Sequence, residues 1–458
     1  MTIKEVQHLH WRAGFGLTPK QILAMENKSK HQIVDDLFLK SKPITNVPFN
    51  FSMFNMYTKN YIHKNEERQK ALSKLNEAQT KNFNISWIKS IVNTEEVLRE
   101  KMTLFWANHF VCRDRNTKYI YKYNTTLRKH ALGDFREFVK AITKEASMIN
   151  YLNLNQNNKK SPNENFAREL LELFTLGEGN YTEKDIKECA RAFTGYSHGF
   201  NGNFILRKNK HDVNQKVFFN QKGNFDGDEI VDIILSKKQC ARYICERIYV
   251  HFVNDIPNDN HVEEMTSIFF KDYNIENLMR YLFMSDWFYA KKNIGNKIKS
   301  PIDLLVGIYK IVPYRFRDEK EFLKIQRLLD QVLLDPPNVG GWKGGKNWIT
   351  TNSLMLRVKL PSMLFEKESY TFKTTGSLDK KNLKIVSVKN KYQDKLDVYV
   401  DWKTYKKRVK KLKLHNLLDS LILCDINSGT SRYISTFGRR PKKKNLVKIM
   451  SLPEYQMC

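Results

Sequence analysis

The sequence predicts a mainly α-helical fold: one large helical domain with long loops rich in glycine and tryptophan, and at most a few short strands. Apolar residues recur at helical spacing along most of the 458 residues, strand-like alternation is confined to short runs, and glycines gather between the helical segments. An apolar fraction of 41% is enough for a sizeable core. We expect residues 1–365 to form the helical core and residues 366–458 to form a basic portion that packs back on it.

Element boundaries follow from capping residues and glycine stops. A helix is expected over residues 18–39, because Pro19 suits the first helical turn. Thr182 and Asp185 form a capping box for a helix that stops at Gly195. Asp228 is the expected N-cap of a helix that reaches about residue 252. Further helices are expected over residues 55–92, 96–111, 163–177, 261–270, 275–287, 302–312, 319–334, 350–365, 405–423 and 443–451, and short strands over residues 216–219, 383–388 and 396–400, the last two as a pair.

The charge balance is strongly positive. The chain has 78 lysines and arginines against 49 acidic residues, a formal net charge of +29. Such a field attracts nucleic acid, anionic lipid, acidic polysaccharide or a phosphorylated ligand, and the alternative is a lysine-rich surface without a specific partner. Basic runs at residues 406–413 and 439–444 make residues 366–458 the most basic part.

Membrane and export signals are missing from the sequence. Mean hydropathy is −0.56, and no apolar run approaches the roughly 20 residues that cross a bilayer. The first residues lack the apolar segment of a signal peptide, so we expect a cytoplasmic protein, with export as the alternative. The six cysteines form no Cys-x-x-Cys pair, and we expect reduced, mostly buried thiols.

Residues 163–177 place three carboxylates and a guanidinium on one helical face. At 100° per residue, the polar side chains fall within an arc of about 140°, opposite the apolar ones. Such a face is either an ordinary solvated surface or the wall of a polar site. Carboxylates this close shift one another's pKa and can perform acid/base catalysis. The candidate catalytic residues are therefore Glu164, Arg168, Glu169 and Glu172, with Asn165 on the same face.

The helix over residues 96–111 is apolar on nearly every side, so we expect it to be buried all round. His109 then needs a partner inside the protein, most often a main-chain carbonyl. The alternative is a site of His109, Glu169 and Glu172 for a divalent metal such as iron, zinc or manganese. The Glu-x-x-His signature of di-metal bundles is missing, and an arginine among the glutamates favours a salt-bridge ladder. The sequence therefore does not determine a cofactor.

A glycine-rich loop at residues 336–348 carries two tryptophans. Residues 340–346 have the G-x-x-x-x-G-K spacing of a phosphate-binding loop, but Asn347 stands where Ser or Thr would hold magnesium and no buried strand precedes the loop. We therefore reject that function. Tryptophan faces near lysines suit sugars, bases and other flat or cationic groups. The candidate ligand-binding residues are His8, Arg12, Asn108, Trp342 and Trp348.

Residues 211–228 contain a last group of polar candidates. His211 is a candidate base or ligand. Asn224, Asp226 and Asp228 alternate as in a calcium loop, but Leu235 holds the twelfth position, where the loop needs glutamate. The sequence contains neither the G-x-S-x-G elbow of hydrolases nor the His-Glu-x-x-His zinc motif.

With these motifs assembled, the chain resembles the DUF1800 family, a bacterial family of unknown function, over nearly its whole length. The resemblance rests on residues 8–16, 101–110, 163–177, 180–182, 192–196, 223–228, 336–342 and 451–456. It implies a mainly helical fold and a genomic neighbour and partner from the DUF1501 family, which resembles the alkaline-phosphatase superfamily, but no established reaction. The family often has a second histidine where this chain has Ala107, which weakens a two-histidine metal site. Many relatives are exported.

Two functions fit these observations. The first is an enzyme with a buried carboxylate and histidine site, with or without a metal, that acts on an anionic substrate. The second is a non-catalytic binding or scaffold protein that uses its basic surface to hold an acidic partner, a polysaccharide or nucleic acid. We favour the enzyme, because the motifs rich in His, Glu, Asp, Gly and Trp exceed what core packing requires.

Overall fold

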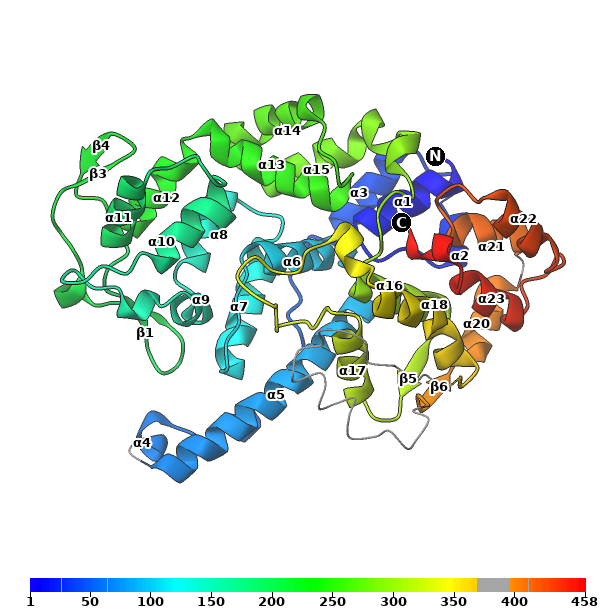
Figure 1. The fold of residues 1–458 in the computed structure, drawn as a ribbon, viewed down its shortest axis with the longest axis horizontal. Coiled ribbons are helices and arrows are strands. Elements are labelled where there is room, and N and C mark those ends of the chain that lie inside the picture. The colour runs from blue at the N-terminus through cyan, green and yellow to red at the C-terminus, as the bar shows by residue number, and fades with distance from the viewer. Residues whose placement is uncertain (26, 64, 369–394, 411) are drawn as a thin grey trace. The chain divides into compact units, whose positions relative to one another are not determined.

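The structure is a computed structural model that describes residues 1–458 except residues 26, 64, 369–394 and 411 (Figure 1). It confirms the predicted fold class, since helices dominate the described chain and its strands form three small two-stranded antiparallel sheets. The expected strand at 383–388 lies outside the described residues. Contacts divide the chain into two compact units, which we call unit 1 and unit 2.

Unit 1 combines residues 1–35, 286–333 and 343–458. Its elements are α1 (Ile3–Arg12), α2 (Pro19–Leu23), η5 (Asp286–Tyr289), η6 (Lys291–Asn293), α16 (Pro301–Ile311), β5 (Tyr314–Phe316), α17 (Lys320–Leu328), η7 (Gly345–Trp348), α18 (Thr351–Phe365), β6 (Val398–Val400), α20 (Trp402–Val409), α21 (Leu414–Leu421), α22 (Ser428–Ser435), α23 (Lys443–Met450) and η8 (Pro453–Gln456). The predicted boundary between the helical core and the basic C-terminal portion, after residue 365, falls inside this unit. Within it, the C-terminal helices pack with the N-terminal one, and Gln7 Nε2 donates to Ser420 O at 2.8 Å.

The core of unit 1 is built from the apolar faces of α16, α18, α20, α21 and α23. Ser300 caps α16 in a capping box with Asp303, and Pro301 occupies its first turn. Trp11 of α1 packs closely against α16, where a Cβ at Gly307 would lie 2.3 Å from the indole ring. Glycine at residue 307 is therefore required by this close approach.

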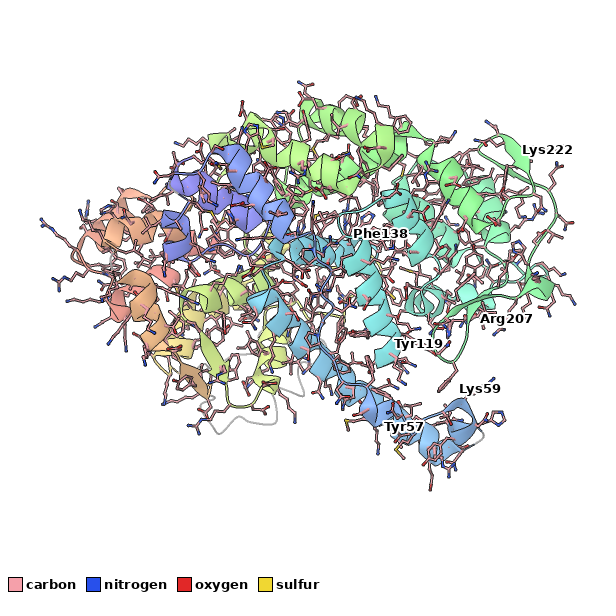
Figure 2. All side chains as sticks on the ribbon, turned by 180° about the vertical axis from the view of Figure 1, so that it is seen from behind. Tyr57, Lys59, Tyr119, Phe138, Arg207 and Lys222 are labelled. Carbon is pink, nitrogen blue, oxygen red and sulfur yellow. The ribbon has the colours of Figure 1, made fainter. Side chains whose placement is uncertain are left out.

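Unit 2 combines residues 36–285 and 334–342, and α3 (Lys30–Lys40) runs from unit 1 into it. Its other elements are η1 (Ser52–Phe54), α4 (Lys59–Ile62), α5 (Glu66–Asn93), α6 (Val97–His109), α7 (Thr117–His130), α8 (Phe135–Ile142), α9 (Ala146–Tyr151), η2 (Leu154–Gln156), α10 (Asn165–Glu169), η3 (Leu170–Thr175), α11 (Glu183–Ala192), β1 (Tyr196–His198), β2 (Phe204–Leu206), η4 (Lys208–Lys210), β3 (Lys216–Phe218), β4 (Gln221–Gly223), α12 (Gly227–Leu235), α13 (Lys238–Phe252), α14 (Asp259–Asp272) and α15 (Ile275–Met284). Tyr57 and Lys59 lie at the outer end of α5 (Figure 2).

The centre of unit 2 is α6, which is buried nearly all round, as its sequence predicts. Trp106 is fully buried, and its Nε1 donates to Ala131 O at 3.1 Å. Glu100 and Arg128 form an ion pair with both side chains only 2% exposed. Trp87 Nε1 also donates to Glu100, at 2.5 Å. The charge of Glu100 thus has two buried donors, which offsets the cost of removing it from water.

Several predicted helices are interrupted where turn residues break them. The helix expected over 18–39 is two helices, α2 and α3, and the helix expected over 55–92 is also two helices, α4 and α5. The helix expected to reach residue 252 is split into α12 and α13, and its N-cap is Asp226 instead of Asp228, because Asp226 and Glu229 form the capping box. The predicted strand at 396–400 exists as β6, and it pairs with β5.

Two further expectations were tested directly. All six cysteines are free thiols, five buried and Cys424 half-buried, as predicted. In the part of the chain that the structure describes, no helix is both long and apolar enough to cross a membrane.

Candidate functional site

The glutamate-rich segment changes helical pitch part-way along. It begins as the α-helix α10 and continues as the π-helix η3, in which Leu176 N donates to Leu171 O at 2.9 Å. Thr175 Oγ1 donates to Leu170 O at 2.6 Å and holds the wider turn. A π-helical turn inserts one extra residue into a helix and is frequent at functional sites. The 100° spacing therefore holds only up to residue 169.

Side chains of other elements bind the carbonyls at the end of η3. Tyr243 Oη donates to Leu173 O at 3.0 Å, and His109 Nε2 meets Phe174 O at 3.0 Å. Gln239 Nε2 donates to Leu176 O at 3.0 Å. Helix ends leave such carbonyls without intrahelical partners. The segment is therefore held through its backbone, from α6 and α13.

The carboxylates of this segment are half-buried, and most have structural partners. Arg168 forms a two-pronged pair with Glu183, at 2.9 and 3.0 Å, and lies 3.5 Å from Glu164. Glu172 accepts a hydrogen bond from Tyr181 Oη at 2.6 Å. Arg168 and its two glutamates, Glu164 and Glu183, form a salt-bridge ladder of the kind that the sequence left open as the alternative to a site.

Glu169 differs from its neighbours. It is half-buried and has no hydrogen-bond or ion-pair partner within the described chain. Burial, and then the nearby charge of Glu172, raise the pKa of its carboxyl, while Arg168 lowers it in part. Of the predicted catalytic residues, Glu169 therefore combines a free carboxyl with a perturbed pKa.

His109 is buried in an aromatic cage. Its ring lies 4.7 Å from Phe110, 5.5 Å from Trp106 and 6.3 Å from Tyr243, centroid to centroid. Burial, and then the positive charge of Arg247, lower its pKa to about 3, so the ring is neutral. Because a carbonyl oxygen can only accept a hydrogen bond, Nε2 of His109 carries the hydrogen and donates to Phe174 O. The other ring nitrogen, Nδ1, has no partner in the described residues.

The structure does not join His109 to the carboxylates through a hydrogen bond or ion pair. The described residues contain no group of three or more His, Cys, Asp or Glu side chains that could hold a metal ion. The metal site of His109, Glu169 and Glu172 therefore stays a prediction without a ligand cluster to support it. The commoner alternative, a core histidine bonded to a carbonyl, describes His109.

Asn108 and Trp342 form a two-way clasp in unit 2. Asn108 Nδ2 donates to Trp342 O at 3.1 Å, and Trp342 N donates to Asn108 Oδ1 at 2.7 Å. Both polar groups of the amide are thus used inside the protein. Trp342 is 6% exposed, and its indole lines a narrow internal cavity of about 10 Å³, room for about one water molecule. Asn108 therefore fixes the glycine-rich loop, and Trp342 presents no open face to a ligand.

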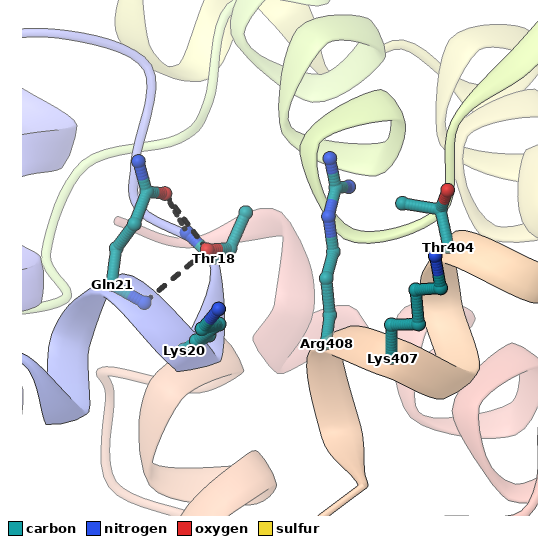
Figure 3. Close-up of a pocket in the computed structure, with 6 residues that line it drawn as sticks. All are labelled: Thr18, Lys20, Gln21, Thr404, Lys407 and Arg408. Carbon is teal, nitrogen blue, oxygen red and sulfur yellow. Dashed lines mark hydrogen bonds between the residues drawn. The ribbon is translucent and has the colours of Figure 1, made fainter.

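Two hollows of the described surface lie in unit 1, along α20. The first, of about 450 Å³, is lined by Trp402 and four lysines: Lys403, Lys406, Lys407 and Lys410. The second, of about 320 Å³, lies between α2 and α20 and is lined by Thr18, Lys20, Gln21, Thr404, Lys407 and Arg408 (Figure 3). Lys407 belongs to both. We call the two together the α20 basic surface.

The α20 basic surface follows from the helix's own pattern. Asp401 caps α20 by accepting from Thr404 N, and Tyr405 and Val409 face the core. The intervening lysines are therefore turned outward and are exposed. Arg408 points inward instead, and its Nη1 donates to the carbonyls of Lys310 and Ile311, which end α16.

Comparison with known proteins identifies the family. The profile of the family described as "Protein of unknown function (DUF1800)" matches residues 8–457. The chain belongs to the DUF1800 family. No curated protein and no solved structure matches it.

Two predicted ligand-binding residues near the start of the DUF1800 match make structural contacts in unit 1. His8 is fully buried, its Nε2 bonds Phe288 O at 3.2 Å, and burial holds its pKa well below the usual value. Arg12 Nη2 donates to Asn296 Oδ1 at 2.7 Å and to Cys458 O at 2.9 Å. Trp348 is 8% exposed. These three belong to unit 1, whereas the glutamate-rich segment belongs to unit 2.

The polar side chains around His211 are also occupied by local contacts. His211 is half-buried, and its Nδ1 bonds Thr194 O at 2.8 Å. The neighbouring Asp212 accepts from Arg191 Nε at 2.8 Å. Asp228, of the rejected calcium loop, pairs with Lys144 at 2.6 Å. The structure therefore does not bring His211 into hydrogen-bond contact with Glu169 or Glu172.

Sequence reasoning singled out the basic run at 406–413 but not the hollows that α20 forms. The signal was present, because Trp402 begins a helix whose outward positions are lysines. The sequence predicts a helix over 405–423 here, whereas α20 begins at Trp402, so the prediction leaves out Trp402 and Lys403.

Proposed function

We propose that this DUF1800 protein binds a polyanion through the α20 basic surface. The observation that carries the proposal is the lining of its two hollows, which contains five lysines, one arginine and no acidic side chain. A hollow that gathers charge of one sign concentrates ligands of the opposite sign.

The charge of this surface is available to a ligand. Within the described chain, the four lysines around Trp402 make no ion pair with an acidic side chain. Lys443 adds a further cation, with its Nζ 4.6 Å from the centroid of the Trp402 ring. A site whose lysines were paired with acidic side chains would have little positive charge left for a partner. The lysines of this surface are unpaired in that sense, so their charge remains.

The arrangement favours a polymer over a single small anion. The two hollows are open, share Lys407 and follow one helix, so a chain with regularly spaced charges contacts several lysines at once. Single-stranded nucleic acid has this character and releases counterions on binding, which makes the affinity depend steeply on salt.

The test is fluorescence anisotropy with a labelled single-stranded DNA 20-mer, at several salt concentrations, on the full chain. Replacing Lys403, Lys406 and Lys407 together by glutamine should weaken binding at least tenfold. It should also reduce the magnitude of the slope of log affinity against log salt by about 2, because each of the three lost phosphate contacts contributes about 0.7 to that slope.

A matched control removes the same charge elsewhere. Lys208, Lys210 and Lys222 are exposed lysines of unit 2, and their triple glutamine variant should bind as the wild type does (Figure 2 labels Lys222). Equal losses in both variants would mean that the net charge of +29 acts diffusely, and an affinity that does not change with salt would overturn the proposal. A labelled acidic polysaccharide or an acidic protein, such as the DUF1501 partner that the resemblance implies, would compete with the DNA if it is the natural ligand.

A second proposal keeps the enzyme function and places its acid/base group at Glu169. What supports it is the free, half-buried carboxyl with a raised pKa on a π-helical segment. A carboxyl that keeps its proton closer to neutral pH can donate it to a substrate. Carboxyl ¹³C NMR titration, assigned with Glu169→Gln, should give a pKa above the usual range that falls in Glu172→Gln. An ordinary pKa for Glu169 would remove this proposal.

A further inference from the structure

The first hollow of the α20 basic surface contains an aromatic ring as well as charge. Of the described residues that line it, Trp402 alone is apolar, and the others are Lys403, Lys406, Lys407 and Lys410. Positive charge attracts any polyanion, whatever groups the polyanion carries between its charges. The indole is therefore the feature of this hollow that distinguishes one class of polyanion from another.

Trp402 and the lysines occupy one stripe of α20. Lys406 follows Trp402 by four residues, and Lys403, Lys407 and Lys410 follow one another at spacings of four and three. Side chains three and four residues apart are neighbours on a helix surface. At a rise of 1.5 Å per residue, the stripe from residue 402 to residue 410 is about 12 Å long. A linear ligand that lies along this stripe therefore meets the ring at one end and the ammonium groups beyond it.

Packing holds the indole of Trp402 in place. Its ring centroid lies 5.4 Å from that of Phe365 and 5.7 Å from that of Tyr405. Lys443 Nζ lies 4.6 Å from the centroid of the indole. None of these three neighbours lines the hollow, so they contact the indole from other sides and leave one side to the hollow. A ring that is already held loses little conformational entropy when a flat group packs against it.

The hollow thus offers a flat apolar surface beside separate positive charges. Single-stranded nucleic acid has the complementary arrangement, because its phosphates carry the charge and each base presents an uncharged π face. In an acidic polysaccharide the charged groups stand on the sugar rings themselves, so packing a ring on the indole would bring those charges against an apolar surface. In a duplex, the neighbouring base pairs cover the base faces. The arrangement therefore favours an unpaired base.

We propose that the polyanion is single-stranded nucleic acid and that one of its bases stacks on Trp402, an inference that rests on the proposed function. The lysines of the stripe contact the phosphates of the neighbouring nucleotides. The lining side chains carry hydrogen-bond donors and no acceptor, so they cannot recognise the amino group of a base. Every base has a π face, so stacking accepts them all. The site therefore binds single strands with little preference for sequence.

A change in the ligand tests this inference without altering the protein. Two labelled 20-mers with the same number of phosphates, oligo-dT and a fully abasic strand, are compared by fluorescence anisotropy on the full chain. The abasic strand should bind about tenfold more weakly, which is within the range that one base–aromatic stack contributes. The slope of log affinity against log salt should be the same for both strands, because the phosphate contacts are unchanged.

Replacing Trp402 by leucine removes the ring and keeps every lysine. Trp402→Leu should weaken the binding of oligo-dT about tenfold and leave the abasic strand and the salt slope unchanged. Tyr433→Leu is the matched control. Tyr433 is 43% exposed and has Lys448 Nζ 5.5 Å from its ring centroid, yet it lines neither hollow. This control should bind both strands as the wild type does.

The outcomes separate this inference from the function on which it rests. Equal binding of the two strands, with a loss of affinity in the triple variant of Lys403, Lys406 and Lys407, would overturn base stacking and leave a surface that binds polyanions by charge. If Trp402→Leu weakens heparin binding as much as oligo-dT binding, the nucleic-acid assignment is wrong. An equal loss in Tyr433→Leu would remove the specific role of Trp402. An unchanged affinity in the triple lysine variant would refute the proposed function, and this inference with it.

Discussion

Replacing Gly341 by alanine tests the clasp between Asn108 and the glycine-rich loop. Gly341 has a φ of +74°, and a Cβ built there would lie 2.3 Å from Asn108 Oδ1 and 3.0 Å from Asn108 O. The left-handed backbone costs an alanine about 1–2 kcal/mol. The contact also pushes Asn108 away and breaks its two hydrogen bonds with Trp342, each worth about 0.5–1.5 kcal/mol.

We therefore expect Gly341→Ala to lower the free energy of unfolding by about 2–4 kcal/mol, measured by urea denaturation followed by tryptophan fluorescence. Gly344 is the matched control three residues later, because a Cβ there meets nothing within 4 Å and its φ is −68°. Gly344→Ala should be neutral or slightly stabilising.

A double-mutant cycle separates the clasp from backbone strain. In an Asn108→Ala background the contact with the side-chain oxygen Oδ1 and both hydrogen bonds are already gone, so Gly341→Ala should cost about 1–2 kcal/mol less than in the wild type. If the two glycine variants have the same stability, or if the cycle shows no coupling, the assigned role of Asn108 is refuted.

Three further predictions follow from groups in the interior. Folded His109 stays neutral down to about pH 3, whereas the unfolded chain takes up a proton at this residue near pH 6.5, so stability falls as the pH drops between these values. His109→Gln keeps an N–H donor for Phe174 O and should reduce this fall by about 1.4 kcal/mol per pH unit below pH 6, measured by urea unfolding, and an unchanged pH slope would contradict it. Glu100→Gln leaves Arg128 buried without its counter-charge and should cost about 3–5 kcal/mol, whereas the exposed pair of Lys81 and Glu77 should tolerate Glu77→Gln with little change in the same assay. A thiol reagent at pH 7 should modify half-buried Cys424 first, and Cys424→Ser should remove that fast phase; equal rates for all six thiols would contradict the burial pattern.

Local sequence signals predicted the elements that depend on neighbouring residues. The capping box of Thr182 and Asp185 is present at the start of α11, and α6 is buried as its apolar pattern predicts. The interruptions of longer helices were missed. α20 ends at Val409 and α21 begins at Leu414, and the sequence between them has no proline or glycine that would predict a break.

The candidate site was predicted less well, because side-chain direction depends on packing. The glutamates were placed on one face by assuming a regular α-helix, and the π-turn that begins at Leu170 changes that face. The π-turn depends on contacts from other elements, including Tyr243 of α13 and His109 of α6. No periodicity within residues 163–177 carries this information.

The sequence by itself determined the helical class, the family, the reduced cysteines and the strong positive charge, because these depend on composition, short-range pattern and motif identity. Only the tertiary structure decided which polar groups face solvent and which are enclosed. It satisfied Asn108 with main-chain groups and left Glu169 free. The physical reason is that hydrogen-bond partners and desolvation come from segments far apart in the chain, which no local pattern specifies.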